Sequence, residues 1–308
     1  MKKKYLITGG LGFIGKAIAL DLIKKNNSVT IIDNQFRHKN LKDFNYKNCN
    51  VYKNDIRDKT SLKKIVKKVD TVIHLAAING TNYFYEQPKL VLDVALKGII
   101  NILEVCEENK IPEFFLASSS EVYYKAPYYP ADEKVPLVIP DPFNPRYTYA
   151  AGKIISEIML LNTKFFKRFV IFRPHNIYGP NMGYNHVIPE IVTKLIKAKK
   201  NLVIQGSGNH TRSFCYIDDF VRGFNILLKK GRNKNIYNIG TQDEIKILQL
   251  IQKLVKISNK KLIIKKTKEK LGSTPKRCPD IKKISKLGFK PKINLDVGLK
   301  KTFEWYSN

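Results

Sequence analysis

The chain has 308 residues, of which 43% are hydrophobic and 27% charged, and 56 Lys and Arg against 26 Asp and Glu give it a formal charge of +30. The apolar content excludes a disordered chain, and no apolar run approaches the roughly 18 residues of a membrane span. The positive charge is mostly lysine, spread along the chain in pairs, which is typical of a solvated surface, so we expect no nucleic-acid partner and no membrane partner. Four widely spaced cysteines, without the spacing of a zinc site or a disulfide framework, predict reduced thiols, no metal and a cytoplasmic protein.

Apolar, β-branched runs alternate with amphipathic segments through the first half of the chain. In chain order, the pattern predicts strands at 5–8, 28–33, 71–76, 113–118 and 169–173, and helices at 13–25, 91–107 and 149–162. This alternation is typical of parallel strands joined by right-handed helical crossovers, with helices on both faces of the sheet. The predicted fold class is therefore α/β, a doubly wound parallel sheet of the Rossmann type.

The pattern loosens from about residue 174, where loops rich in Pro, Gly and Asn surround shorter elements. We therefore expect a sheet domain over residues 1–174, to which a segment at about 212–240 returns, and a smaller C-terminal lobe over residues 175–308. Ligands are often bound where two such units meet. The substrate is expected in the cleft between them.

A glycine-rich turn, GGLGFIG at residues 9–15, joins the first predicted strand to the first predicted helix. Glycine lets the chain turn tightly and approach a diphosphate, and the free N–H groups of the helix N-terminus attract the anion. The next predicted strand ends at Asp33, 18 residues after Gly15, where a carboxylate can bind the ribose hydroxyls of NAD and repel the 2′-phosphate of NADP. The sequence predicts an NAD site, with NADP left open by Arg37 and Lys39, and with a turn used only for packing as the alternative.

Tyr149 and Lys153 are four residues apart in a predicted helix, so they share one face of it. An ammonium near a phenol favours the phenolate, which can remove a hydroxyl proton while a hydride leaves the same carbon. Taken alone, such a pair is more often a solvated helix face. The serines at 118–120 strengthen the functional interpretation, because they end a predicted strand, where open α/β sheets bind their ligands.

These motifs resemble the extended short-chain dehydrogenase/reductase family, specifically its nucleotide-sugar epimerases, dehydratases and decarboxylases. The resemblance extends over essentially the whole chain and rests on TGGLGFIG (8–15), DIRD (55–58), HLAA (74–77), SSSEVY (118–123), YAAGK (149–153), RPHNIYGP (173–180), RSFCYIDD (212–219) and KRCPDI (276–281). It implies NAD as the cofactor, a nucleotide-diphosphate sugar as the substrate, a homodimer, and a place in polysaccharide or glycan-precursor synthesis. It also makes the sheet domain the NAD-binding domain and the C-terminal lobe the main nucleotide-sugar lobe.

The resemblance assigns roles to individual residues. The implied cofactor-binding residues are Gly9, Gly12, Phe13, Ile14, Gly15, Asp33, Asn34, Asp55, Ile56, Leu75, Ala76, Ala77, Tyr149 and Lys153. The implied catalytic residues are Ser119, Glu121, Tyr149 and Lys153, with Tyr149 as the base and Lys153 as its electrostatic partner. The implied substrate-binding residues are Ser119, Ser120, Asn176, Arg212 and Arg277, the last three at the diphosphate, with surface arginines as the alternative for the last two.

Enzymes of this group begin by forming a 4-keto sugar, and Glu121 bears on the step that follows. It comes after Ser119 and Ser120, as in decarboxylases and GDP-mannose-type dehydratases, whereas Ser120 lacks the Asp that dTDP-glucose-type dehydratases carry. A purely structural carboxylate is an equal alternative. We predict a nucleotide-sugar 4-epimerase, with a UDP-glucuronate-type decarboxylase or a nucleotide-sugar 4,6-dehydratase as the alternative, and an NAD-binding scaffold as the non-enzyme alternative.

Overall fold

A seven-stranded parallel sheet forms the centre of the protein, in a computed structural model that describes residues 2–36, 44–184, 186–268 and 274–308. The strand order is β11-β6-β5-β4-β1-β2-β3, and all neighbouring strands pair in parallel. The bounds are β1 (Lys4–Thr8), β2 (Ser28–Asp33), β3 (Cys49–Lys53), β4 (Thr71–His74), β5 (Glu113–Ala117), β6 (Arg168–Pro174) and β11 (Asn235–Ile239). The prediction of a doubly wound α/β sheet is confirmed.

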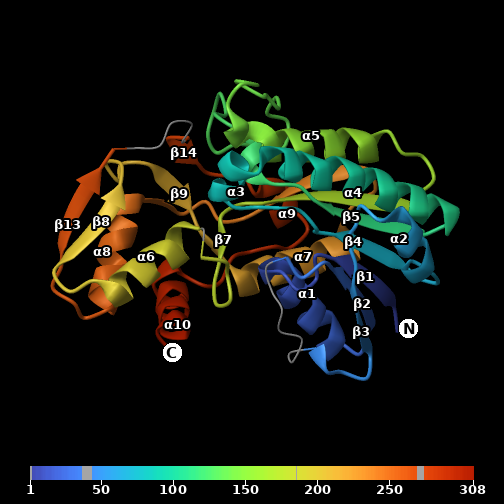
Figure 1. Ribbon diagram of the computed structural model, residues 1–308, viewed down its shortest axis with the longest axis horizontal. Helices are drawn as coiled ribbons and strands as arrows, with labels where there is room; N and C mark the ends of the chain where they lie inside the picture. The colour runs from blue at the N-terminus through green and yellow to red at the C-terminus, as the bar shows by residue number, and fades with distance from the viewer. Residues whose placement is uncertain (1, 37–43, 185, 269–273) are drawn as a thin grey trace.

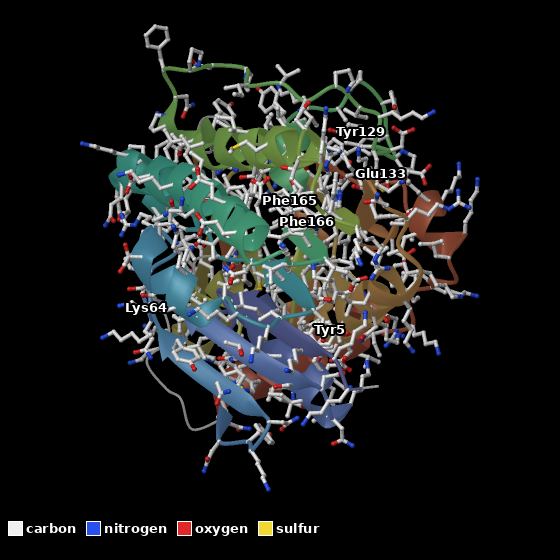
Figure 2. All side chains as sticks on the ribbon, turned by 90° about the vertical axis from the view of Figure 1, so that its right-hand side faces the viewer. Tyr5, Lys64, Tyr129, Glu133, Phe165 and Phe166 are labelled. Carbon is white, nitrogen blue, oxygen red and sulfur yellow. The ribbon has the colours of Figure 1, made fainter. Side chains whose placement is uncertain are left out.

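Helices cover both faces of this sheet (Figure 1). One face carries α2 (Lys59–Ile65), α4 (Pro88–Glu108) and α5 (Thr148–Leu161), and the other carries α1 (Phe13–Lys24) and α7 (Ile217–Lys230). Because both faces are covered, the central strands are mostly apolar, and Phe114 and Phe115 on β5 are both fully buried on opposite faces. Phe165 and Phe166, which follow α5, are labelled in Figure 2; Phe166 is buried in the core on this face, and Phe165 is partly buried against it.

The predicted elements differ from the observed ones mainly at their ends. Strand β4 stops at His74, two residues early, because its partner β1 ends at Thr8, opposite His74; the last bond of this ladder is from Leu75 N to the Thr8 carbonyl, at 3.1 Å. Helix α4 starts three residues before its predicted start, at Pro88, since proline is well accommodated in the first turn of a helix. Strand β3 and helix α2 were not predicted, and β3 is largely solvent-facing, which removes the apolar pattern of a buried strand.

The C-terminal lobe lies at one end of the sheet (Figure 1) and has small sheets of its own. Strand β8 (Asn201–Gln205) pairs with β13 (Ile263–Thr267), and β9 (Thr211–Ser213) lies between β12 (Glu244–Lys246) and β14 (Lys276–Arg277). The lobe also contains α6 (Val187–Lys197), α8 (Ile247–Ile257) and α10 (Leu295–Ser307), while β7 (Ile177–Tyr178) pairs with β10 (Cys215–Tyr216). Between these segments the chain returns to the large sheet through α7 and β11, so the lobe is held against the carboxyl ends of the strands.

Short elements complete the edge of the sheet that faces the lobe. They are α3 (Thr81–Glu86), η2 (Ser120–Tyr123), η3 (Pro145–Tyr147) and α9 (Lys282–Ser285). Helix α3 follows β4, η2 follows β5, and η3 precedes α5. The ends of these elements meet at this edge, so the loop residues of α3, η2 and η3 lie close together. Among the helices of the described ranges, none is both long enough and apolar enough to cross a lipid bilayer.

Candidate active site

Two adjoining cavities open where the carboxyl ends of the strands face the lobe. The first, of about 320 Å³, is lined by the glycine turn, by the ends of β2, β4 and β5, and by α5. The second, of about 620 Å³, is lined mainly by α6, β8 and α8 of the lobe. Glu121, Asn176 and Arg277 line both cavities, so the two form one cleft that joins the sheet domain to the lobe.

The glycine turn forms a cradle with no room for side chains. A Cβ atom on Gly9 would lie 2.8 Å from the Ala76 Cα, and one on Gly15 would lie 2.2 Å from the Gly9 carbonyl oxygen. Gly9 has a φ of +69°, which an L side chain rarely adopts, and α1 begins directly after Gly12, so its N-terminal N–H groups face the cradle. All fourteen residues predicted to bind the cofactor line the first cavity, and this cradle fits a dinucleotide diphosphate.

Two carboxylates lie at the adenosine end of the first cavity. Asp33, at the end of β2, accepts backbone N–H bonds from Leu11 at 3.1 Å and from Gln35 at 2.8 Å, which hold its carboxylate at the cavity wall. Asp55 is instead paired with Arg57 at 2.8 Å, and hydrogen bonds from this guanidinium lower the pKa of Asp55 to about 2. Backbone N–H groups therefore position Asp33 and Arg57 positions Asp55, and both carboxylates line this end of the cavity. Arg37 and Lys39, which left NADP open, lie outside the described residues.

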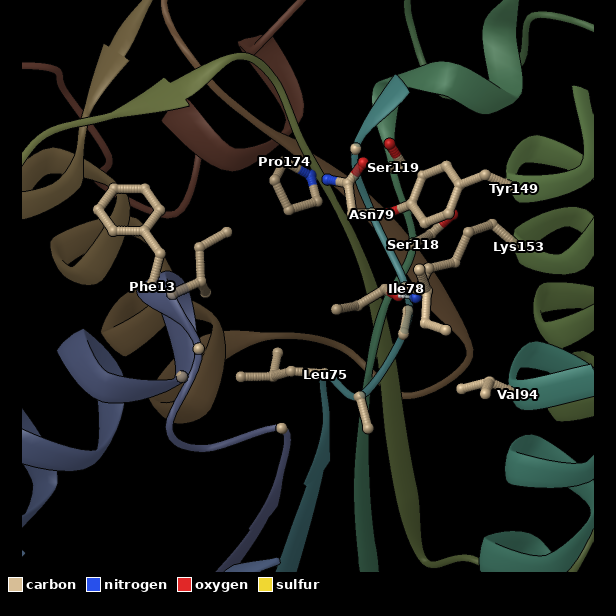
Figure 3. Close-up of a pocket in the computed structure, with 18 of the residues that line it drawn as sticks. Phe13, Leu75, Ile78, Asn79, Val94, Ser118, Ser119, Tyr149, Lys153 and Pro174 are labelled. Atoms are coloured by element: carbon tan, nitrogen blue, oxygen red, sulfur yellow. Dashed lines mark hydrogen bonds between the residues drawn. The ribbon is translucent and has the colours of Figure 1, made fainter. Parts of the chain in front are cut away.

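Tyr149 and Lys153 extend from α5 into the first cavity, opposite Ser118 and Ser119 (Figure 3). Tyr149 is 7% and Lys153 5% exposed, and the Lys153 Nζ lies 5.8 Å from the centre of the Tyr149 ring. The same Nζ donates a 2.7 Å bond to the Ala117 carbonyl at the end of β5. Burial lowers the pKa of Lys153 to about 8, with Glu157 acting in the opposite direction. The phenol of Tyr149 therefore lies beside the buried amino group of Lys153.

The serine run crosses from β5 into η2, and all three of its members, including the predicted substrate-binding residues Ser119 and Ser120, line the first cavity. Ser119 Oγ accepts a 3.1 Å bond from the Glu121 N–H and caps η2, which fixes its orientation. Ser118 Oγ is buried in the cavity wall and has no hydrogen-bond partner among the described residues. Ser118 was not among the predicted site residues, although its position next to Ser119 was a signal that could have identified it.

Glu121 and Arg277 bind each other across the cleft. The Arg277 guanidinium meets the Glu121 carboxylate with two bonds, of 2.6 and 2.7 Å, and the Arg146 Nη2 lies 3.5 Å from the same carboxylate. Burial alone would raise the pKa of Glu121, but Arg277 and Arg146 outweigh it and lower this pKa to about 2. The predicted catalytic carboxylate and a predicted phosphate-binding arginine are therefore partners in this structure, and Glu121 is ionised at neutral pH.

Arg212 and Asn176 lie beside this ion pair. Strands β9 and β14 run in parallel with Arg212 in register with Arg277, and Arg212 donates a 2.7 Å bond to the Thr274 carbonyl. Burial and then the charge of Arg277 lower the pKa of Arg212 to about 9. Asn176 donates a 3.0 Å bond to the Ser213 carbonyl and lines both cavities. Of the three residues predicted at the diphosphate, Asn176 and Arg277 therefore line both cavities, and Arg212 lines the second.

Several residues of the cleft were not predicted from the sequence. Arg146, on η3, lines the second cavity, and its side chain is only 12% exposed. Phe84, on α3, stacks on the Tyr149 ring with 5.2 Å between centroids, and His186 lines both cavities. Arg146 lies three residues before Tyr149, but it reaches the cleft through the turn of η3, for which the sequence carries no periodic signal.

Comparisons with known proteins agree with this geometry. The model of the NAD dependent epimerase/dehydratase family matches residues 5–240. A putative UDP-glucose 4-epimerase from Methanocaldococcus jannaschii is 34% identical over 313 residues, which cover 98% of this chain and 98% of the relative. A UDP-N-acetyl-alpha-D-glucosaminuronate decarboxylase from Bacillus cytotoxicus is 32% identical over 324 residues, which cover 99% of this chain and 98% of the relative.

A solved structure of a third kind of enzyme is similar as well. DesIV, a dTDP-glucose 4,6-dehydratase from Streptomyces venezuelae, was solved as a double mutant with NAD bound. It has a TM-score of 0.89 and 25% identity to this chain, covering 98% of this chain and 96% of its own. The three proteins carry the names of three different activities, so overall similarity does not select one reaction.

Proposed function

Since the chain belongs to the NAD-dependent epimerase/dehydratase family and is an enzyme that uses NAD, we propose that it inverts carbon 4 of a nucleotide-diphosphate sugar. The glycine turn and Asp33 hold the dinucleotide in the first cavity. Asn176, Arg212 and Arg277 bind the diphosphate of the substrate in the second cavity. The sugar then lies between the two, next to Tyr149.

Tyr149 is the proposed base. In its phenolate form, stabilised by Lys153, it takes the proton of the sugar 4-hydroxyl while Ser119 holds the oxygen by a hydrogen bond. Bound NAD supplies a reversible acceptor for the hydride on the same carbon. The 4-keto sugar turns within the cleft, and Tyr149 returns the proton to the oxygen when the ketone is reduced from its other face.

The ionisation of Glu121 favours an epimerase over a dehydratase. A dehydratase requires a second acid–base group, which removes a proton beside the ketone and helps to expel a hydroxyl. Glu121 is the candidate, but its pKa is about 2 beside Arg277 and Arg146 and moves only back toward the ordinary value of 4.5 when a diphosphate takes Arg277. At neutral pH Glu121 is therefore ionised and has no proton to donate to a leaving hydroxyl. Epimerisation needs only Tyr149 as its acid–base group, which supports it as the proposed reaction.

A decarboxylase is the second candidate because of the three arginines around Glu121. Two guanidinium groups suffice for a diphosphate, and Arg146, beside Glu121, could bind the carboxylate of a sugar acid. In that reaction the 4-keto group accepts the electron pair released by the loss of carbon dioxide. This candidate shares Tyr149, Lys153 and Ser119 with the epimerase.

A product assay tests the proposal and separates the candidates. The purified enzyme is incubated with a panel of UDP-, GDP- and CDP-sugars, including uronic acids, and the products are separated and weighed by mass spectrometry. Epimerisation gives a product of unchanged mass with a new retention time. Loss of water or of carbon dioxide in place of this product would contradict the proposed 4-epimerase.

We also propose that the enzyme is a cytoplasmic homodimer. Helices α4 and α5 carry exposed apolar side chains on their outer face, namely Ile100, Ile155, Ile158 and Leu161, which are between 36% and 54% exposed. A second copy would bury them. Light scattering tests this: a monomeric mass for the wild type would contradict the proposal, and Ile158→Glu should convert a dimer to a monomer.

A further inference from the structure

Helix α5 carries a third buried ionisable residue on the face that holds Tyr149 and Lys153. Glu157 is four residues beyond Lys153, so these three side chains follow one another at intervals of about one turn. Glu157 is 1% exposed. The proposed chemistry gives this carboxylate no role, although burying an ionised group is costly.

Arg173, on β6, occupies both oxygens of Glu157. Its Nε donates to one oxygen at 2.8 Å and its Nη2 to the other at 2.5 Å. The same guanidinium donates through Nη1 to the Tyr123 hydroxyl at 2.7 Å, and Tyr123 in turn donates to Asn238 on β11 at 2.8 Å. Glu157 is therefore held in a fixed place and turned toward Arg173, while Lys153 donates to the Ala117 carbonyl.

Among the described residues, Glu157 is the carboxylate that acts on the charge of Lys153. Tyr149 and Glu157 face it from α5, His74 faces it from β4, and Arg173 lies behind Glu157 on β6. Burial, and then the charge of Lys153, lower the pKa of His74 to about 3, so His74 is neutral. Burial works against the ammonium of Lys153, and Glu157 is the group that opposes this effect.

We infer that Glu157 and Arg173 are a positioning pair for Lys153, in which Glu157 keeps the buried ammonium charged and Arg173 keeps the carboxylate from binding it directly. A direct ion pair would draw the ammonium away from Tyr149 and cancel its effect on the phenol. Removing a buried pair as a whole is often neutral for stability, which is consistent with a role other than holding the fold together. The catalytic consequence rests on the proposed function, since it requires Tyr149 to be the base.

The pair predicts opposite effects for its two members. Glu157→Gln leaves the positive charge of Arg173 unbalanced, so the pKa of Lys153 falls, by about one pH unit. Arg173→Met frees the carboxylate to approach the ammonium, so the pKa of Lys153 rises by a similar amount. The double variant Glu157→Gln/Arg173→Met removes both charges, so the pKa of Lys153 should lie above that of Glu157→Gln and below that of the wild type. A pair that only stabilised the fold would not shift the pKa of Lys153 in opposite directions in the two single variants.

The pKa of Lys153 can be measured without any substrate. Trace labelling of the ligand-free enzyme with acetic anhydride over a pH series, followed by mass spectrometry of the Lys153 peptide, gives the pH at which this amine becomes reactive. The expected wild-type value is about 8. Glu113→Gln is the matched control. Glu113 also pairs with an arginine, Arg168, at 2.8 Å, but this pair lies at the amino ends of β5 and β6, away from Lys153. This control should leave the Lys153 pKa unchanged.

A Lys153 pKa that stays at the wild-type value in Glu157→Gln, or that moves in the same direction in both single variants, would overturn the inference. If Arg173→Met does not fold, two results decide the question: the lower pKa of Lys153 in Glu157→Gln, and the rise of this pKa from that value in the double variant. Turnover is scored separately: with an active substrate, Glu157→Gln should lower kcat about tenfold with little change in KM. If no nucleotide sugar reacts while the Lys153 shifts appear, the proposed function fails and the pair stands.

Discussion

The two halves of the cleft are built in different ways. The cofactor half is formed by strand ends and the turns directly after them, so its residues come from short segments such as 9–15 and 75–77. The substrate half is assembled from residues far apart in the chain, and its central ion pair joins Glu121 to Arg277, 156 positions later. Local backbone geometry therefore determines the first half, whereas the packing of the lobe determines the second.

The halves differ in charge as well. The cofactor half presents glycine backbone, helix N–H groups and Asp33, all in place before a ligand arrives. The substrate half presents arginines whose charge is partly balanced by Glu121. In the proposed function, a diphosphate bound at Arg277 displaces the Glu121 carboxylate, whereas the diphosphate of the dinucleotide binds to backbone N–H groups at the start of α1. Substitutions in the two halves should have separable effects.

The largest expected effect is the loss of NAD binding in Gly15→Ala. The added methyl group would lie 2.2 Å from the Gly9 carbonyl oxygen and 2.7 Å from the Gly10 Cα, so the turn has to open. Losing two charge-assisted bonds to the diphosphate weakens binding by about a hundredfold. Calorimetric titration with NAD measures this. Gly183→Ala is the control, since a Cβ there meets nothing within 4 Å, and equal losses in both variants would contradict the cradle.

A smaller effect, confined to the substrate half, is expected for Arg277→Met. Removal of one arginine from a charge-assisted diphosphate contact should raise KM for the nucleotide sugar about thirtyfold and leave the Kd of NAD unchanged. The single variant also leaves the Glu121 carboxylate without Arg277. The double variant Glu121→Gln/Arg277→Met separates this effect on KM from the loss of the diphosphate contact. An equal fall in NAD affinity would show that the halves are not independent.

Glu121→Gln should strengthen the binding of UDP by a few-fold. The neutral amide no longer competes with the diphosphate for the two N–H groups of Arg277, which the carboxylate engages at 2.6 and 2.7 Å. The measurement is a UDP titration of both proteins with NAD present. Weaker binding in the variant would indicate that Glu121 orients Arg277 for the ligand and does not compete with it.

The last expected effect concerns stability, namely the pH dependence of the stabilisation that Glu121 contributes. Its pKa falls from 4.5 to about 2 on folding, so its stabilisation is fully present above pH 4.5 and is lost as the pH falls toward 2. With a quarter of the side chain exposed, we expect about 1–2 kcal/mol. Urea unfolding of the wild type and Glu121→Gln should show this difference at neutral pH and none near pH 2. A difference that persists in acid would contradict the ion-pair origin.

Prediction from the sequence succeeded where neighbouring residues determine the geometry. The glycine turn lies directly between β1 and α1, and the four-residue spacing of Tyr149 and Lys153 was enough to place both on one helix face. Parallel strands also bring their carboxyl ends to one edge, so Asp33, Ala76 and Ser119 could be expected at the same cleft.

The remaining features depend on long-range packing that no local pattern reports. Glu121 and Arg277 were assigned separate roles, and only the register of β14 beside β9 brings Arg277 to the end of β5. Arg146 reaches the cleft through a single turn of η3. Arg173, the buried partner of Glu157, lies on β6, so sequence spacing did not reveal this pair beside Lys153.

Turnover by Tyr149→Phe is the most direct test of the central claim, that one phenol beside Lys153 does the acid–base work. The variant keeps the ring that stacks on Phe84 at 5.2 Å and removes only the hydroxyl. With a substrate that the wild type converts, the account predicts unchanged NAD binding and a kcat lower by about a hundredfold or more. A kcat near that of the wild type would contradict it.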